Sequence, residues 1–325
     1  MEELQTERPK RNYGIDLLRV VSMIMIALLH TMNRGGISDS LPAHSMRYAT
    51  GWLLKIAAYG AVDCYALISG YVSYGRKHRA SSLIYLYFQA LFYTVLSTAL
   101  TLVFHREDVG IRELIATLLP FAYDTYWYFT AYFCLFFFMS AFDRIVDILS
   151  RRNMTRLVIA LFAIFSFLPT VLHSDIATVD HGYSFVWLAA LYIFGAYIKK
   201  YSFTPFKHNV SNLLGYAVCV LITWCSKLVI ERLTEKLPQL PINGYYLVEY
   251  HSFTVLLGAI FLLLFFRDLR CGKAATAIAK FFAPVSFGAY LFHESPFIRE
   301  YLITDAFADY AALNAVLLPL AAIGT

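Results

Sequence analysis

Charged residues are scarce in this sequence: Asp, Glu, Lys and Arg make up 15% of its 325 residues, whereas 59% are hydrophobic. A soluble globular domain usually contains about 25% charged and about 45–50% apolar residues. Cysteine is rare as well, and none of the five cysteines forms a C-x-x-C pair, so neither a disulfide framework nor a zinc site is expected. The composition excludes an ordinary soluble domain and indicates a polytopic membrane protein.

The motifs of several enzyme classes are absent. The sequence has no glycine-rich phosphate loop, no HExxH and no G-x-S-x-G, so nucleotide-hydrolysing pumps, zinc peptidases and α/β-hydrolases find no support. The net charge of +5 comes from Lys and Arg scattered over short loops, without the basic and aromatic face of a nucleic-acid-binding protein. We therefore expect no nucleic-acid partner and no metal.

Ten apolar runs approach or reach the roughly 17–25 residues that a helix needs to cross a bilayer. The segment 111–119 instead places its Ile and Leu residues on one face, as in a helix along the membrane surface. Neither an internal repeat nor a Pro- or Ser-rich linker is visible. We predict an all-α, polytopic membrane helical bundle with about ten transmembrane helices, forming a single domain over residues 1–325. The ten runs are 14–33, 49–74, 82–104, 126–142, 156–173, 184–198, 211–231, 249–267, 278–293 and 309–325.

Lys and Arg are concentrated in alternate connecting segments, which include the N-terminal tail, residues 76–79 and residues 267–280. Positively charged loops tend to stay on the cytoplasmic side of a membrane. We therefore expect residues 1–12 to form a cytoplasmic tail and both ends of the chain to be cytoplasmic.

The first apolar run contains Asp16, Arg19 and His30. Eleven positions along a helix place Arg19 and His30 on one face, about 16 Å apart along the axis. A charged side chain at membrane depth normally faces the interior of the bundle and marks a functional site. Two simpler interpretations remain open: Arg19 pairs with Asp16 or reaches lipid phosphates, and His30 is an interfacial histidine.

Four segments resemble motifs of the acyltransferase type 3 family, integral membrane enzymes that acylate cell-surface glycans. In the second segment, Cys64 and Tyr65 stand where phenylalanines are more usual. The resemblance extends from about Tyr13 to Phe297 and implies a multi-pass protein of the cell inner (plasma) membrane. The segments are GIDLLRVVSMIMIALLH (14–30), AVDCYALISGYV (61–72), YWYFTAYFCLFFF (126–138) and SFGAYLFHESPF (286–297).

The resemblance also implies a reaction. An acyl group, most simply acetyl, is transferred from cytoplasmic acyl-CoA to a hydroxyl of a surface glycan or a lipid-linked glycan. Membrane lipid would surround the protein. The phosphates of the donor need fixed positive charge. We therefore expect a donor site that includes Arg19, Ser69, Gly70, Tyr71, Arg76 and Lys77.

A sugar hydroxyl needs a general base near neutral pH, and the imidazole of His30 is suited to that role. It could act on the hydroxyl directly or first take the acyl group itself. Asp63, the third expected catalytic residue beside His30 and Arg19, could orient an imidazole or neutralise Arg19. For the acceptor we expect contacts from Trp127, His293 and Glu294, although Trp127 also suits an interfacial aromatic belt.

Buried Asp, Arg and His residues in a bundle of this size are also typical of carriers. A proton-coupled secondary transporter or a glycolipid flippase is therefore the alternative function. The missing internal repeat favours the enzyme.

Overall fold

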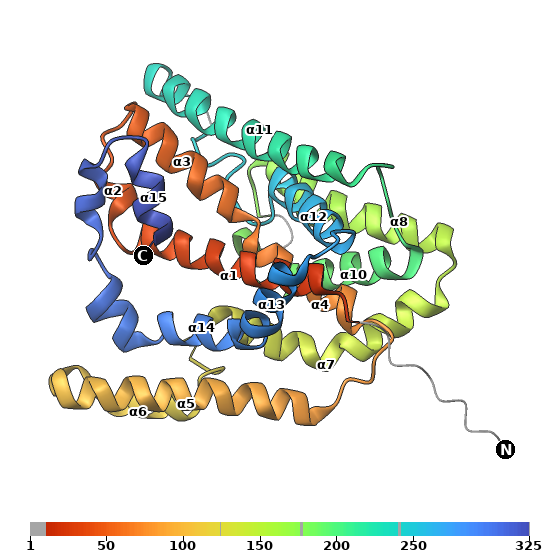
Figure 1. The fold of residues 1–325 in the computed structure, drawn as a ribbon, viewed down its shortest axis with the longest axis horizontal. Helices are drawn as coiled ribbons and strands as arrows, with labels where there is room; N and C mark the ends of the chain where they lie inside the picture. Colours follow the sequence, from red (N-terminus) through yellow and green to blue (C-terminus); the bar gives the residue numbers. More distant parts are fainter. Residues whose placement is uncertain (1–10, 124, 176–177, 240–241, 325) are drawn as a thin grey trace.

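The computed structural model describes residues 11–123, 125–175, 178–239 and 242–324, and every regular element in these ranges is a helix (Figure 1). In chain order the helices are α1 (Tyr13–Asn33), α2 (Ile37–Ser40), α3 (Met46–Tyr59), α4 (Ala61–Ser73), α5 (Ala80–Phe104), η1 (Arg106–Asp108), α6 (Ile111–Leu118), α7 (Trp127–Ile148), α8 (Arg151–Phe162), η2 (Ala163–Phe167), α9 (Leu168–Leu172), η3 (Asp180–Gly182), α10 (Phe185–Tyr201), α11 (Asn209–Lys236), α12 (Phe253–Arg267), α13 (Lys273–Phe282), η4 (Ala283–Val285), α14 (Ser286–His293), η5 (Ile298–Ile303), η6 (Ala308–Ala312) and α15 (Leu317–Gly324).

The predicted all-helical membrane bundle is confirmed, but the prediction of about ten spans is not. Within the described residues, seven continuous helical stretches are long and apolar enough to cross a membrane. Of the other three predicted runs, two form the shorter helices α10 and α12, with 17 and 15 residues. The run 309–325 contains η6 and the eight-residue helix α15, which is only about 12 Å long. The seven stretches are Tyr13–Asn33, Met46–Ser73, Ala80–Phe104, Trp127–Ile148, Arg151–Leu172, Asn209–Lys236 and Lys273–His293.

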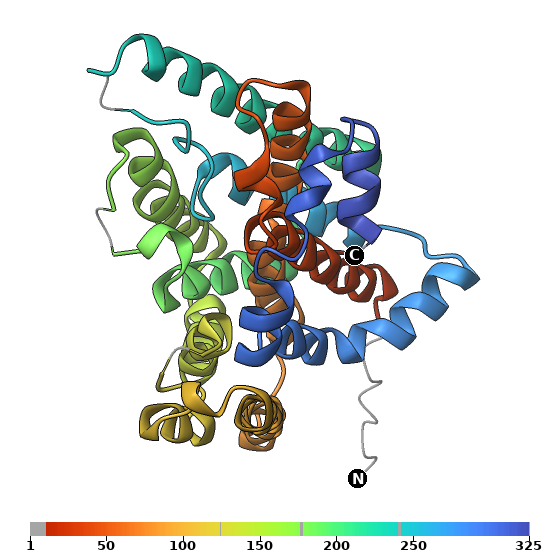
Figure 2. The ribbon, with the colours of Figure 1, turned by 90° about the vertical axis from the view of Figure 1, so that its left-hand side faces the viewer.

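The centre of the bundle is formed by α4, α10 and α12. Every residue of α10 from Trp187 to Ile198 is buried, as expected for a helix that is apolar on all sides. The long helix α11 runs along one edge of the molecule and α5 along the opposite edge (Figure 1). In the turned view, α6 lies beside α5, which is seen end-on (Figure 2). The outer helices expose large apolar side chains such as Phe88 and Phe92, as suits helices that face lipid.

Glycines allow α4 and α10 to touch through their backbones. A Cβ atom added at Gly70 would collide with the carbonyl oxygen of Tyr192, and one added at Gly195 would lie 2.8 Å from the backbone nitrogen of Tyr71. Small residues commonly permit such close approach between membrane helices. The backbone of α10 therefore fills the space beside Gly70, and no room is left for a ligand next to this member of the expected donor site.

Helix α1 is held at both ends by distant parts of the chain. At its start, the Oδ1 atom of Asn12 accepts hydrogen bonds from the first free N–H groups of the helix, and its Nδ2 donates to the carbonyl of Arg267 at 2.9 Å. Such a cap satisfies donors that would otherwise be unpaired. At its end, the backbone of Asp305 donates to the carbonyl of Arg34 and that of Phe307 to Gly35. The C-terminal segment thus packs against the end of α1 that carries His30.

The Gly70 contact leads to a stability prediction. Gly70→Ala should destabilise the protein by about 1–3 kcal/mol, because the added methyl group forces two packed backbones apart. The control is Gly258→Ala in α12, where the new Cβ would lie 3.6 Å from its nearest neighbours and should be neutral or slightly stabilising. Thermal unfolding in detergent measures both. Equal melting temperatures for the two variants would contradict the packing role.

Candidate active site

Arg19 and His30, the two predicted residues of α1, line two separate cavities. Arg19 lines a cavity of about 420 Å³ near the start of the helix, and His30 lines one of about 50 Å³ near its end. The two cavities share no lining residue, but Arg19 and Met23, which lines the second cavity, lie one helical turn apart. One turn is about 5.4 Å along the axis. The two cavities are therefore separate but lie a short distance apart along α1.

Tyr65 of α4 lies between the two cavities. Its ring lines the His30 cavity, and its hydroxyl donates to the backbone carbonyl of Arg19 at 2.8 Å. Tyr65 thus contacts both the His30 cavity and a residue that lines the Arg19 cavity.

The Arg19 cavity is strongly cationic. Asp16 bridges two of its basic residues, with its Oδ1 2.9 Å from Nη1 of Arg19 and its Oδ2 2.5 Å from Nε of Arg11. The Arg19–Asp16 pair, one of the simpler interpretations of the sequence, is therefore present in the structure. Because Arg76 and Lys199 also line the cavity, four cations face one carboxylate there. This charge suits an anionic ligand such as one that carries phosphates.

Only part of the predicted donor site gathers around this cavity. Arg19, Tyr71 and Arg76 line it, and the ring of Tyr71 also lies 4.9 Å from Nζ of Lys199. Ser69 donates its hydroxyl to the carbonyl of Tyr65, which satisfies it within its own helix. Lys77 is exposed and outside the cavity lining.

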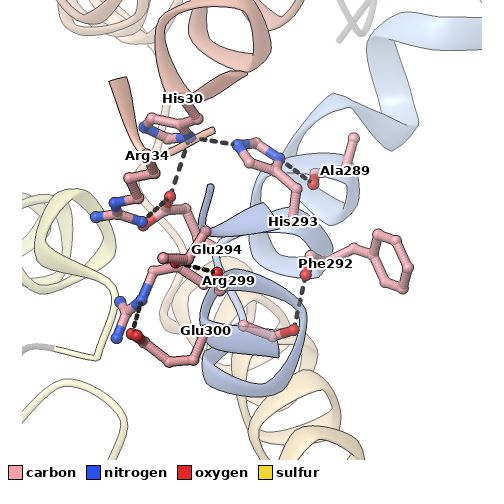
Figure 3. A network of polar contacts seen from close by, with 10 residues as sticks. His30, Arg34, Ala289, Phe292, His293, Glu294, Arg299 and Glu300 are labelled. Atoms are coloured by element: carbon pink, nitrogen blue, oxygen red, sulfur yellow. Dashed lines mark hydrogen bonds and ion pairs between the residues drawn. The ribbon is translucent and has the colours of Figure 1, made fainter. Parts of the chain in front are cut away.

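At the other end of α1, His30 belongs to a network with His293, Glu294 and Arg34 (Figure 3). Nδ1 of His30 lies 2.8 Å from Nε2 of His293 and 3.0 Å from Oε1 of Glu294. The same carboxylate oxygen lies 2.5 Å from Nη1 of Arg34. The structure thus brings together His30 and two of the three residues predicted to contact the acceptor.

The network assigns the tautomer of His30. Nδ1 of His293 lies 2.7 Å from the carbonyl oxygen of Ala289, which can only accept, so this nitrogen carries the proton. In a neutral His293, Nε2 is then an acceptor, and Nδ1 of His30 must donate. Nε2 of His30 is left unprotonated, and no described residue donates to it. An imidazole whose Nδ1–H is held by a carboxylate and whose Nε2 is free has the arrangement of a general base.

Glu294 is ionised despite its burial, with only 4% of its side chain exposed. Burial by itself would raise the pKa of this carboxyl group. Hydrogen bonds from His30 and Arg34, together with the positive charge of Arg34, outweigh that effect and lower the pKa to about 2. The site therefore holds a permanent negative charge beside His30.

The His30 cavity is mainly aromatic. Trp127, the third predicted acceptor residue, lines it, and its ring lies 4.7 Å from that of Tyr183. Tyr128 and Tyr290 also line the cavity, and their hydroxyl oxygens are buried without a hydrogen-bond partner among the described residues. Arg34 and Tyr290 were not predicted as site residues from the sequence. For Arg34 a signal existed, because it follows His30 by four positions and so shares its helical face.

Asp63 takes neither of the two roles that we expected. It is fully buried, and its Oδ1 accepts from Nε1 of Trp187 at 2.9 Å. No hydrogen bond or ion pair joins it to Arg19 or His30 within the described residues. Because Trp187 comes from α10, this pairing could not be read from the spacing within the first two spans.

Two groups of side chains offer metal-ligating atoms among the described residues. One is His30, His293 and Glu294, and the other is His105, Glu107 and Asp108. In the first group the guanidinium of Arg34 already contacts the carboxylate oxygen that a cation would need. This positive charge opposes a divalent ion, so the absence of a metal remains our prediction.

Comparisons with known proteins identify the family of the chain. The family described as an acyltransferase domain matches residues 12–325, which is essentially the whole chain. In the same comparisons, no curated protein and no solved structure matches the chain. Apart from Arg11, the match covers the residues of both cavities and the helices that form them. The chain therefore belongs to the type 3 acyltransferase family and is a membrane acyltransferase.

Proposed function

We propose that this acyltransferase transfers an acyl group from cytoplasmic acyl-CoA to a hydroxyl of an extracytoplasmic glycan or lipid-linked glycan. The observation that carries the proposal is the pair of cavities on α1, one cationic and one containing the His30 base, a single helical turn apart. The phosphates of CoA would bind among Arg11, Arg19, Arg76 and Lys199. The arm that carries the thioester would then reach past Tyr65 to His30.

The proposal assigns an orientation. The Arg19 cavity faces the cytoplasm and the His30 cavity the outside, because the basic connecting segments lie at the Arg19 end. The protein would lie in the cell inner membrane with its N-terminus in the cytoplasm. In this orientation, α10 and α12 would cross the membrane as buried helices, which need no lipid-facing length.

His30 would remove the proton from the acceptor hydroxyl through its free Nε2. Glu294 holds the ring in position and stabilises the positive charge that the imidazole gains, while Arg34 balances the carboxylate between turnovers. Trp127 lines the cavity as a flat apolar surface suited to a sugar face. No metal takes part in this scheme.

Loss of the base should abolish transfer. His30→Ala should lower the rate by on the order of 10²–10⁴-fold, the usual contribution of a positioned general base. The matched control is His44→Ala, since His44 pairs with Glu235 away from both cavities. The assay follows radiolabelled acetyl groups from acetyl-CoA into glycans of membrane vesicles from expressing cells, normalised to protein abundance. Full activity in His30→Ala would refute the mechanism.

The small volume of the His30 cavity, about 50 Å³, favours acetyl over longer acyl groups. Each added methylene should cost roughly tenfold or more in kcat/KM. Ile26→Ala, which enlarges the cavity, should improve transfer from butyryl-CoA relative to acetyl-CoA. Ile24→Ala removes an exposed side chain from the same helix and should leave the preference unchanged. Equal use of acetyl-, butyryl- and hexanoyl-CoA by the wild type would contradict an acetyl-sized site.

The ionised Glu294 predicts a pH-dependent stability difference. Glu294→Gln should destabilise the protein by on the order of 1–3 kcal/mol at neutral pH, because charged hydrogen bonds are lost. The pKa of this carboxyl group is about 2, below its ordinary value of 4.5. The extra stability of the wild type over Glu294→Gln is therefore fully present at a pH above this ordinary pKa and is lost as the pH falls toward 2. Unfolding in detergent from about pH 7 to about pH 3 should show the two proteins converging. A constant difference would count against this role.

A further inference from the structure

Two phenol groups beside His30 lack the hydrogen bonds that buried hydroxyls normally make. The hydroxyl oxygens of Tyr128 and Tyr290 are shielded from solvent and have no partner among the described residues. Buried polar groups are satisfied in the large majority of cases, and an exception calls for a physical reason. A substrate atom that arrives only during the reaction would provide one.

Both phenols belong to the cavity that contains the base. Tyr128 and Tyr290 line the cavity with His30, and their rings meet edge to face with centroids 6.3 Å apart. The ring of Tyr290 also lies 6.0 Å from that of His293, which hydrogen-bonds to His30. The two tyrosines thus lie next to the place where the acceptor hydroxyl would be activated.

Other hydroxyls of the same cavity are already occupied. Tyr65 donates to the carbonyl of Arg19, and Ser286 donates to that of Ala283. Tyr128 and Tyr290 therefore differ from these neighbours in having donors available for a ligand. A hydrogen-bond acceptor for these two O–H groups must fit into a cavity of about 50 Å³. A carbonyl oxygen is small enough.

We infer that Tyr128 and Tyr290 form the acyl-carbonyl site, in which their O–H groups donate to the carbonyl oxygen of the acyl thioester. The inference rests on the proposed function. The acceptor oxygen attacks the carbonyl carbon as its proton passes to Nε2 of His30, and the C=O electron pair moves onto the oxygen that the two phenols bind. When the C=O bond re-forms, the C–S bond breaks, and the sulfur leaves with its electron pair and takes the proton from His30. The products are the acyl ester and free CoA.

Donors placed where charge develops lower the barrier more than they strengthen binding of the ground state. Tyr128→Phe and Tyr290→Phe should therefore each lower kcat by on the order of 10²–10³-fold. The KM for acetyl-CoA should change little, because the CoA phosphates bind in the separate Arg19 cavity.

Tyr126 supplies a matched control. Its hydroxyl is also buried without a partner among the described residues, and its ring lies 6.1 Å from that of Tyr290, but it does not line the His30 cavity. Tyr126→Phe should therefore keep the wild-type kcat. If the effect of the other two variants came only from deleting a buried hydroxyl in this cluster, all three would behave alike.

The experiment measures kcat and KM for acetyl-CoA in the vesicle assay, for the wild type, His30→Ala and the three Phe variants. A selective fall in kcat for Tyr128→Phe and Tyr290→Phe supports the inference. If the wild type transfers acetyl groups and His30→Ala does not, yet these two variants match Tyr126→Phe, the inference alone is overturned. A wild type without transfer overturns the proposed function and the inference with it.

Thermal unfolding identifies a variant that fails to fold. At such a position, 3-fluorotyrosine replaces phenylalanine, because it keeps the shape of the side chain and makes the O–H a stronger donor. A changed kcat at unchanged KM then supports the carbonyl site, and an unchanged kcat overturns it.

Discussion

The ionised carboxylate of Glu294 is the interaction on which the candidate active site depends. It lies directly after α14, yet it contacts His30 of α1 at 3.0 Å and Arg34, which directly follows α1, at 2.5 Å. Taking a charge out of water is costly unless it is paired. Glu294 therefore stays buried only while α1 and α14 keep their relative position, and the orientation of the His30 ring follows from that constraint.

Helix α1 is itself held in position at both of its ends. Its start is tied to the end of α12 through Asn12, and its end is tied to the segment that follows η5 through the backbones of Arg34 and Gly35. A helix fixed at both ends transmits position along its length with little freedom to rotate. The Arg19 cavity and the His30 cavity are therefore held in a fixed relation, as the proposed transfer between them would require.

Local periodicity predicted those features that a single helix determines. The spacing of Arg19 and His30, the pairing of Arg19 with Asp16 and the start and end of α1 follow from the sequence of that segment. The contacts of Asp63 with Trp187 and of Gly70 with Tyr192 could not be predicted from local periodicity, because both partners come from α10. The prediction of about ten spans was not confirmed where apolar runs form buried or short helices, since hydropathy does not distinguish a core from lipid. The unpartnered hydroxyls of Tyr128 and Tyr290 have no sequence signal, because a missing hydrogen bond exists only in three dimensions.

Tyr65 gives the arrangement a further property. An enzyme whose two reagents approach from opposite faces of a bilayer risks becoming a leak for protons and ions. Tyr65 lines the His30 cavity, and its hydroxyl donates to the backbone carbonyl of Arg19, which lines the other cavity. Under the proposed function, this side chain would separate the two sides until a donor arm displaces it, which would limit such leakage.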